Sequence, residues 1–215
     1  MTGFDPTSGM PVWFARRALP EGATAIACVL GDAHPYRHVI DTTVSEEPGT
    51  VLYRGEYTAD GEMTSCVVDP AFQQGGIDLW YVEESEQGAD PPATNLLAFA
   101  TPEWPDGSIV SIDDADARGV DLREQVGALR WWTETGQVHQ VYVAAHMRRR
   151  RIGSKLTLTG AALTLGRRWP SLWATGELTD MGAVFVSRAP WTSRVAPRSM
   201  SHPPMTPTDA WTGIP

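Results

Sequence analysis

The sequence has 215 residues, of which 42% are hydrophobic and 20% are charged. These values suit one globular domain with a sizeable core, and they exclude an intrinsically disordered or fibrous protein. No apolar run reaches the ~18 residues that a membrane-spanning helix needs. Residues 1–10 lack the basic and apolar regions of a signal peptide, so the sequence predicts a cytoplasmic protein with no membrane partner. Cys28 and Cys66 lack the spacing of metal ligands and are expected to be buried thiols, and no metal site is predicted.

The charge is unevenly distributed along the chain. Residues 1–130 hold 22 acidic side chains and 7 arginines, whereas residues 131–215 hold 4 acidic and 10 basic side chains. The basic part can bind an anionic ligand and the acidic part a cationic one. The alternative is that the uneven distribution of charge has no functional role. The formal net charge of −9 argues against nucleic acid as a partner.

Short apolar runs alternate with polar connections in the first 127 residues. Five runs have the length and composition of strands: residues 11–17, 24–30, 50–58, 63–69 and 77–83. Three polar stretches are expected to be loops, the first with some short-helix character: residues 31–48, 85–92 and 101–120. The acids Asp113, Asp114 and Asp116 of the last stretch are expected on a solvated surface.

The pattern is clearest from residue 128 onward. Residues 128–133 and 137–143 are expected to be neighbouring antiparallel strands, joined by a tight turn and followed by an amphipathic helix over 152–168. A final strand at 171–176 and a short helix at 179–188, capped by Thr179, are expected next. Together these elements predict an α/β (α+β) fold with a mixed, mainly antiparallel sheet flanked by helices. One domain covers residues 1–189, and a Pro/Ser/Thr-rich tail covers 190–215.

The Arg-rich turn from Arg148 to Ser154 carries the main chemical signal. It leads directly into a helix, whose N-terminus exposes unpaired N–H groups and a partial positive charge. Consecutive amides in a tight turn form a nest for phosphate oxygens, and arginine side chains add forked donors that suit phosphates. Gly153 permits close approach of the backbone to a ligand.

The stretch VYVAAHMRRRRIGSKL resembles motif A of the GNAT N-acetyltransferases, in which (Arg/Gln)-x-x-Gly-x-(Gly/Ala) follows an apolar strand. Arg148 matches the first position and Gly153 the last, whereas Arg151 stands where the pattern has its middle glycine. The later stretch LTDMGAVF resembles the ending of some small actinobacterial and phage-encoded members. The resemblance covers about residues 128–188, and it implies a GNAT-like fold that binds acetyl-CoA.

The resemblance also implies roles for individual residues. The strand Val141-Tyr142-Val143 is expected to be splayed by a bulge, so that its free backbone groups pair with the pantetheine amides. A backbone N–H near Val143 is expected to stabilise the oxyanion of the tetrahedral intermediate. The pyrophosphate is expected on the amides from Arg149 to Ser154, with help from the side chain of Arg148 or Arg150. The implied cofactor-binding set is Val141, Tyr142, Val143, Arg148, Arg149, Arg150, Arg151, Ile152, Gly153 and Ser154.

Candidate catalytic residues are fewer. Family members often place a tyrosine acid after the last short helix, but the corresponding region here holds Phe185 and Ser187 and no tyrosine. Ser187 is a candidate proton relay or an ordinary surface serine. His139 lies on the strand beside the expected thioester and is a candidate base, or a packed or solvent-facing histidine.

Three functions remain open from the sequence. The first is an acetyl-CoA-dependent N-acyltransferase that modifies a primary amine of a small molecule or a protein. The second is a non-catalytic GNAT-like binding or structural module, for example in a phage particle, and the third is a phage enzyme that modifies nucleic-acid bases. The tail is expected either to pack on a neighbouring subunit or another protein, or to fold back on its own domain.

Overall fold

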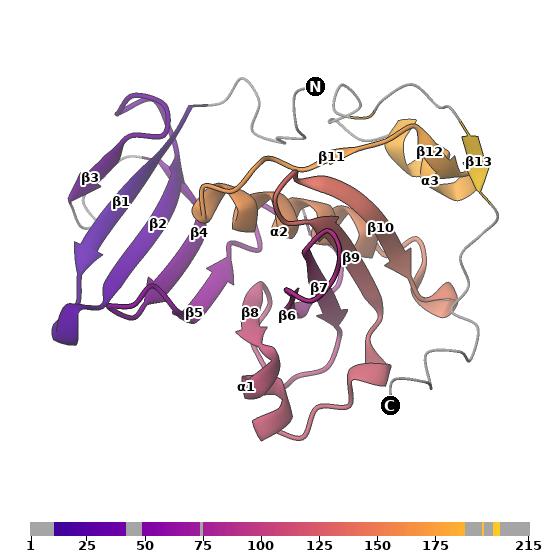
Figure 1. Cartoon of the computed structure of the whole chain (residues 1–215), viewed down its shortest axis with the longest axis horizontal. Helices are drawn as coiled ribbons and strands as arrows, with labels where there is room; N and C mark the ends of the chain where they lie inside the picture. Colours follow the sequence, from indigo (N-terminus) through magenta and orange to yellow (C-terminus); the bar gives the residue numbers. More distant parts are fainter. Residues whose placement is uncertain (1–10, 42–48, 74, 188–194, 196–199, 203–215) are drawn as a thin grey trace.

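The computed structural model describes residues 11–41, 49–73, 75–187, 195 and 200–202. A large, mainly antiparallel sheet of eleven strands curves around the longest helix (Figure 1). The order of strands across it is β11-β10-β9-β7-β6-β8-β5-β4-β2-β1-β3. The strands of this sheet are β1 (Val12–Ala18), β2 (Thr24–Leu30), β3 (Val39–Asp41), β4 (Thr50–Tyr57), β5 (Met63–Val68), β6 (Trp80–Glu86), β7 (Ala93–Phe99), β8 (Ser108–Ser111), β9 (Gly127–Trp132), β10 (Gln137–Val143) and β11 (Trp173–Ala174).

Two antiparallel groups of strands make up this sheet. β1, β2, β4 and β5 form one group, and β6, β7, β9 and β10 form the other. The short strand β8 joins them, because it runs parallel to β6 and antiparallel to β5. The joint to β5 consists of only two residue pairs, Cys66 with Ile109 and Val67 with Ser108.

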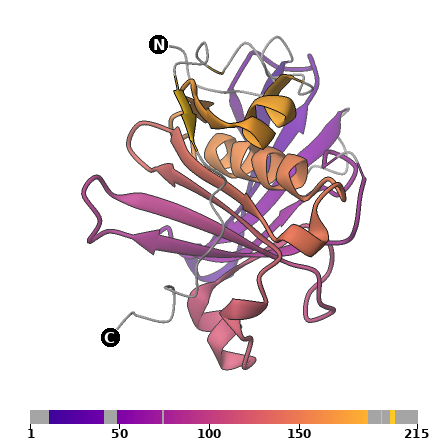
Figure 2. The ribbon, with the colours of Figure 1, turned by 90° about the vertical axis from the view of Figure 1, so that its right-hand side faces the viewer.

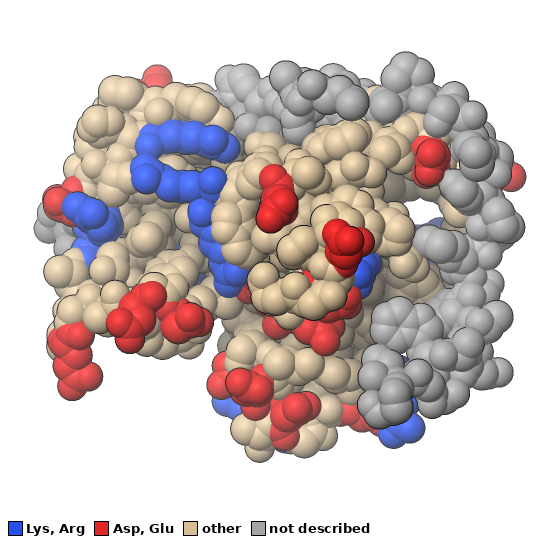
Figure 3. Space-filling model, in the orientation of Figure 1, with Lys and Arg blue, Asp and Glu red and all other residues tan. Residues whose placement is uncertain are grey.

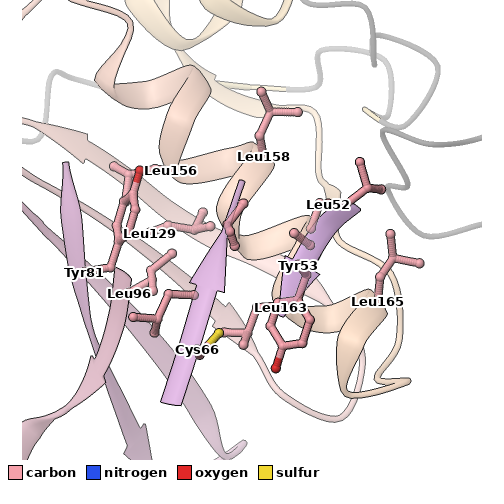
Figure 4. Packing of buried hydrophobic residues seen from close by; sticks show 14 of the residues in the cluster. Leu52, Tyr53, Cys66, Tyr81, Leu96, Leu129, Leu156, Leu158, Leu163 and Leu165 are labelled. Atoms are coloured by element: carbon pink, nitrogen blue, oxygen red, sulfur yellow. The ribbon is translucent and has the colours of Figure 1, made fainter. Parts of the chain in front are cut away.

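The helix α2 (Ile152–Gly166) packs against strands of both groups and forms the centre of the core. Thirteen of its 15 residues are buried, four of them polar or charged, so the helix is buried on nearly every side and is not the amphipathic helix that the sequence predicted. Figure 4 shows leucines of α2 meeting side chains of β4, β5, β6, β7 and β9. Glycines allow the close approach, because a Cβ on Gly160 would lie 2.5 Å from Leu129 and one on Gly166 would lie 2.7 Å from Tyr53.

On the opposite face of the sheet, α1 (Ile112–Ala117) packs against β6 and β8. A capping box starts this helix, since Ser111 and Asp114 exchange hydrogen bonds. The acids Asp113, Asp114 and Asp116 are exposed, as the sequence predicted. Figure 3 shows acidic side chains gathered at the lower edge of the molecule, where Figure 1 places α1.

The sequence-based expectations are correct for most elements, but six elements were not expected, including the two short strands over residues 177–179 and 200–202. β1, β2, β4 and β5, the hairpin of β9 and β10, α2 and α3 (Asp180–Ser187) lie where they were expected. β6 begins three residues later than expected, and β3, β7 and the unit of β8 and α1 were expected to be loop or were not identified. β7 is buried on both faces in the middle of the sheet, so it shows no alternation of polar and apolar residues.

Past α2, the chain forms a short second sheet beside β11. β12 (Glu177–Thr179) pairs in parallel with β13 (Met200–His202), and Val195 forms a parallel bridge with Ala174. These described parts of the expected tail fold back on their own domain, and the remainder of residues 190–215 lies outside the described residues. Among the described helices, none is long and apolar enough to span a bilayer.

Candidate functional site

The turn between β10 and α2 has an unusual backbone. Arg149 and Arg151 have φ angles of 65° and 66°, in the left-handed region that glycine favours. Arg151 is also the N-cap residue of α2, and it adopts a glycine-like conformation at the position where the pattern that the sequence resembles has a glycine. Strained residues of this kind persist only when the surroundings hold them, and they concentrate at ligand sites. When residues in the left-handed conformation alternate with residues in the right-handed conformation, successive backbone N–H groups point toward one side and form an anion-binding nest.

The helix start keeps its hydrogen-bond donors available. The N-cap residue makes no side-chain cap, as the anion-binding expectation required. Within the described part of the chain, no hydrogen bond uses the backbone N–H groups of Arg149, Arg150, Ile152, Gly153 or Ser154. These donors lie at the positive end of a 15-residue helix dipole and beside four arginines. The turn therefore has the donors and the charge to bind a phosphate or pyrophosphate group.

A cavity of about 670 Å³ lies against this turn. It brings together nine of the ten expected cofactor-binding residues, all but Arg150. Its lining residues are Val141, Tyr142, Val143, Ala145, Arg148, Arg149, Arg151, Ile152, Gly153, Ser154, Thr179, Met181, Gly182 and Phe185. We call this space the first cavity.

The strands β10 and β11 diverge beside the first cavity. They pair in parallel only through Gln137 and Val138, so the edge of β10 from residue 139 to 143 has no strand partner on that side among the described residues. On its other side β10 pairs with β9, and the register shifts between Val138 and Gln140 so that His139 is the extra residue of a bulge. An extended ligand with amide groups can add to the unpaired edge as a further strand does.

A second, smaller cavity of about 140 Å³ lies where the two strands begin to separate. It shares Val141, Thr179, Gly182 and Phe185 with the first cavity, so the two adjoin along β10 and α3. His139 lines this second cavity and not the first.

His139 lies against Trp132, with ring centroids 4.7 Å apart. Partial burial, and to a smaller extent the nearby charge of Arg130, lower the pKa of His139 below its usual 6.5. Arg130 itself is bound to Glu86 at 2.5 Å. A neutral imidazole at pH 7 can accept a proton, which a general base must do.

The helix α3 supplies the wall that sequence reasoning did not assign. Thr179 caps α3 as expected, since its hydroxyl accepts from the Gly182 N–H at 2.9 Å. Phe185 reaches across to the start of α2, where a Cβ on Gly153 would lie 3.6 Å from its ring. Figure 2 shows α3 beside α2 and β10. The stretch LTDMGAVF was the available signal for this wall, but its spacing alone indicated no contact with the turn.

Two other expected residues have different surroundings. Ser187 is exposed at the end of α3, donates to the carbonyl of Val184 at 3.0 Å, and is not among the residues that line either cavity. The Nε of Arg148 donates to the carbonyl of Val143 at 3.3 Å, which fixes the guanidinium beside β10 at the rim of the first cavity.

A buried ion pair supports the turn from behind. Lys155, in the first part of α2, places its ammonium 2.8 Å from Asp106 and 2.7 Å from the carbonyl of Ile77. The loop that carries Ile77 also touches the turn, because a Cβ on Gly76 would lie 3.1 Å from the carbonyl of Arg150. The start of α2 is thereby attached to the loops that precede β6 and β8.

No protein-family model, curated protein or solved structure matches this chain. The features of this chain that bear on function are the two adjoining cavities, the unbonded amides of the turn and the unpaired edge of β10.

Proposed function

We propose that this chain is a GNAT-like N-acyltransferase that binds acetyl-CoA and transfers the acetyl group to a primary amine of a small molecule or a protein. One observation carries the proposal: a single cavity joins a helix start with unbonded amides to the unpaired edge of a strand. The first feature suits the pyrophosphate and the second suits the two amides of the pantetheine arm.

The chemistry follows from this placement. With the pyrophosphate on the amides of Arg149 to Ser154, the pantetheine arm runs along β10 from Val143 toward the bulge. The thioester then lies near Val141 and His139, two to four residues further along β10 than the position near Val143 that the resemblance implied, and a backbone N–H of the unpaired edge there stabilises the oxyanion. The amine nitrogen attacks the thioester carbon, the C–S bond breaks, and the proton that the amine loses passes to neutral His139. The CoA thiolate leaves and takes up a proton from solvent.

A second candidate is a module that binds CoA without catalysis. The position of Ser187 favours it, because this residue is outside both cavities and supplies no acid to the leaving thiolate. The two candidates agree on the binding site and differ only in turnover.

Thermal stability in the presence of CoA and acetyl-CoA tests the binding. A ligand at 100 times its dissociation constant stabilises the folded state by about 2.7 kcal/mol, or roughly 5–10 °C for a chain of this size. Gly153→Asp places a carboxylate among the phosphate-binding amides, and the site has room for its Cβ. We expect this variant to lose the CoA-dependent shift while it keeps the stability of the unliganded protein.

The matched control is Gly88→Asp, which makes the same change in open space on another loop. It should keep the full shift, and absence of any shift in the unmodified chain at millimolar CoA would refute the proposal. Turnover is then measured as release of free thiol with a panel of amines. Thiol release that falls at least tenfold in His139→Gln supports the enzyme, whereas binding without release supports the non-catalytic module.

A further inference from the structure

The second cavity continues the first beyond the point where the thioester is expected. The two share four residues, and the bulge residue His139 lines the second cavity two residues along β10 from the shared Val141. A ligand that lies along β10 with its phosphates on the turn therefore points its far end into the second cavity. The end of an acyl-CoA that reaches this point is the acyl group.

The second cavity has a largely apolar lining. The side chains concerned come from β9, β10, β11, β12, α3 and the bridge beside β11: Leu129, Val138, Trp173, Leu178, Val186 and Val195. The lining also includes the polar residues His139, Gln140, Thr157, Thr175, Glu177 and Thr179. The Thr157 hydroxyl donates to the Gly153 carbonyl at 2.8 Å, the Thr179 hydroxyl accepts from the Gly182 N–H at 2.9 Å, and the Trp173 indole donates to the Thr135 carbonyl at 3.1 Å. Transfer from water into such a lining is favourable for a hydrocarbon chain and costs free energy for a polar group.

The size of the second cavity exceeds the needs of an acetyl group. An apolar protein cavity of about 150 Å³ accommodates a benzene molecule, which has six carbons. At about 140 Å³, this cavity has comparable room, whereas the acetyl group has two carbons. Bound acetyl-CoA would leave most of the apolar surface without a partner.

We infer that the preferred donor is a CoA thioester with an acyl chain of about four to six carbons, whose chain occupies the second cavity. This inference rests on the proposed function and specifies its donor. The reaction step is the same as for acetyl-CoA: the bond between the acyl carbon and sulfur breaks, a bond from the acyl carbon to the amine nitrogen forms, and the amine proton goes to His139. The amine approaches from outside the second cavity.

Calorimetric titration of the full chain with CoA, acetyl-CoA, butyryl-CoA and hexanoyl-CoA tests the inference. Burial of each methylene strengthens binding about fourfold, so butyryl-CoA should bind about 15-fold more tightly than acetyl-CoA. Equal or weaker binding of the longer thioesters, with CoA itself bound, overturns the inference and leaves the proposed function standing. Failure of CoA to bind refutes the proposed function instead.

Two variants on α3 make the test specific. Val186 lines the second cavity, whereas Val184 is 52% exposed and lines neither. Val186→Phe should reduce the preference for butyryl-CoA over acetyl-CoA at least fivefold without weakening CoA binding, and Val184→Phe should preserve it. Val186→Leu serves as a milder change if the larger one impairs folding. An unchanged preference in a folded Val186 variant contradicts the placement of the chain. A large rise in the KM for the amine, with an unchanged chain-length preference for the donor, would assign the second cavity to the acceptor and overturn the inference.

Discussion

Replacement of Lys155 by methionine tests whether the buried ion pair holds the start of α2 in place. Lys155 is the only lysine of the chain, and its side chain is 1% exposed. Lys155→Met keeps a side chain of similar length and apolar character but removes the ammonium group. Three contacts disappear: those to the two carboxylate oxygens of Asp106, at 2.8 and 3.1 Å, and that to the carbonyl of Ile77 at 2.7 Å.

The expected loss of stability follows from these contacts. Breaking a buried ion pair by removal of one partner costs about 3–5 kcal/mol, mainly because the remaining charge stays buried and uncompensated. Asp106 is 18% exposed and keeps the hydrogen bond from the Leu79 N–H at 2.8 Å, so part of its charge remains solvated. We therefore expect Lys155→Met to lower the free energy of unfolding by about 2–3 kcal/mol.

Urea denaturation followed by tryptophan fluorescence measures this change. Asp106→Asn is the companion variant, and it should cost more than Lys155→Met because the buried ammonium then has no counter-charge. The double variant should cost less than the sum of the two single ones. A loss below about 0.5 kcal/mol in Lys155→Met would refute the reasoning, since even a single bond to a charged group contributes about 1.5 kcal/mol.

Three further predictions concern the rest of the molecule. Gly107→Ala should lower the free energy of unfolding by about 2–4 kcal/mol, because Gly107 has a φ of 84° and the added Cβ would lie 2.0 Å from the Val68 carbonyl oxygen. The control Gly88→Ala, in open space, should change the free energy of unfolding little. NMR titration of His139 should give a pKa below 6.5, and a pKa above 6.5 would contradict the description of its surroundings. Because the unfolded chain then binds the proton more tightly, the contribution of this residue to stability is lost as pH falls through 6.5 toward the lowered pKa. Burial raises the pKa of the Cys66 thiol to about 12, so this thiol should react with a thiol reagent at pH 8 only after denaturation, and rapid labelling of the folded protein at this position would be inconsistent with its burial.

The sequence predicted the unit of β9, β10 and α2 and the location of the turn, because these depend on local pattern. Strand alternation, a tight turn and the helical spacing of apolar residues can each be recognised within about 20 residues, although the sequence predicted an amphipathic helix and α2 is buried on nearly every side. The α1 helix was missed even though Ser111 and Asp114 have the spacing of a capping box, so a readable signal was available. The sequence signal for β7 was weaker, because Ala93–Phe99 is buried on both faces and its apolar pattern resembles that of a buried helix segment.

The parts of the site that the sequence did not predict depend on contacts between distant segments. The wall formed by Thr179, Gly182 and Phe185 faces the start of α2 only because α3 folds over it. The bulge at His139 and the early separation of β10 from β11 likewise result from strand pairing and not from local composition. The glycine-like conformation of Arg151 could not be inferred either, since arginine disfavours it and the surrounding structure must impose it.

The position of α2 in the chain has a consequence for synthesis of the protein on the ribosome. This helix covers Tyr53, and β4 ends at Tyr57, whereas α2 is completed at Gly166, about 110 residues later. At 5–20 residues per second, the first strand group waits roughly 5–20 s for the helix that buries its apolar face. During that interval the apolar face of the paired strands has no helix against it, so we expect chaperone binding and aggregation to begin in this N-terminal strand group.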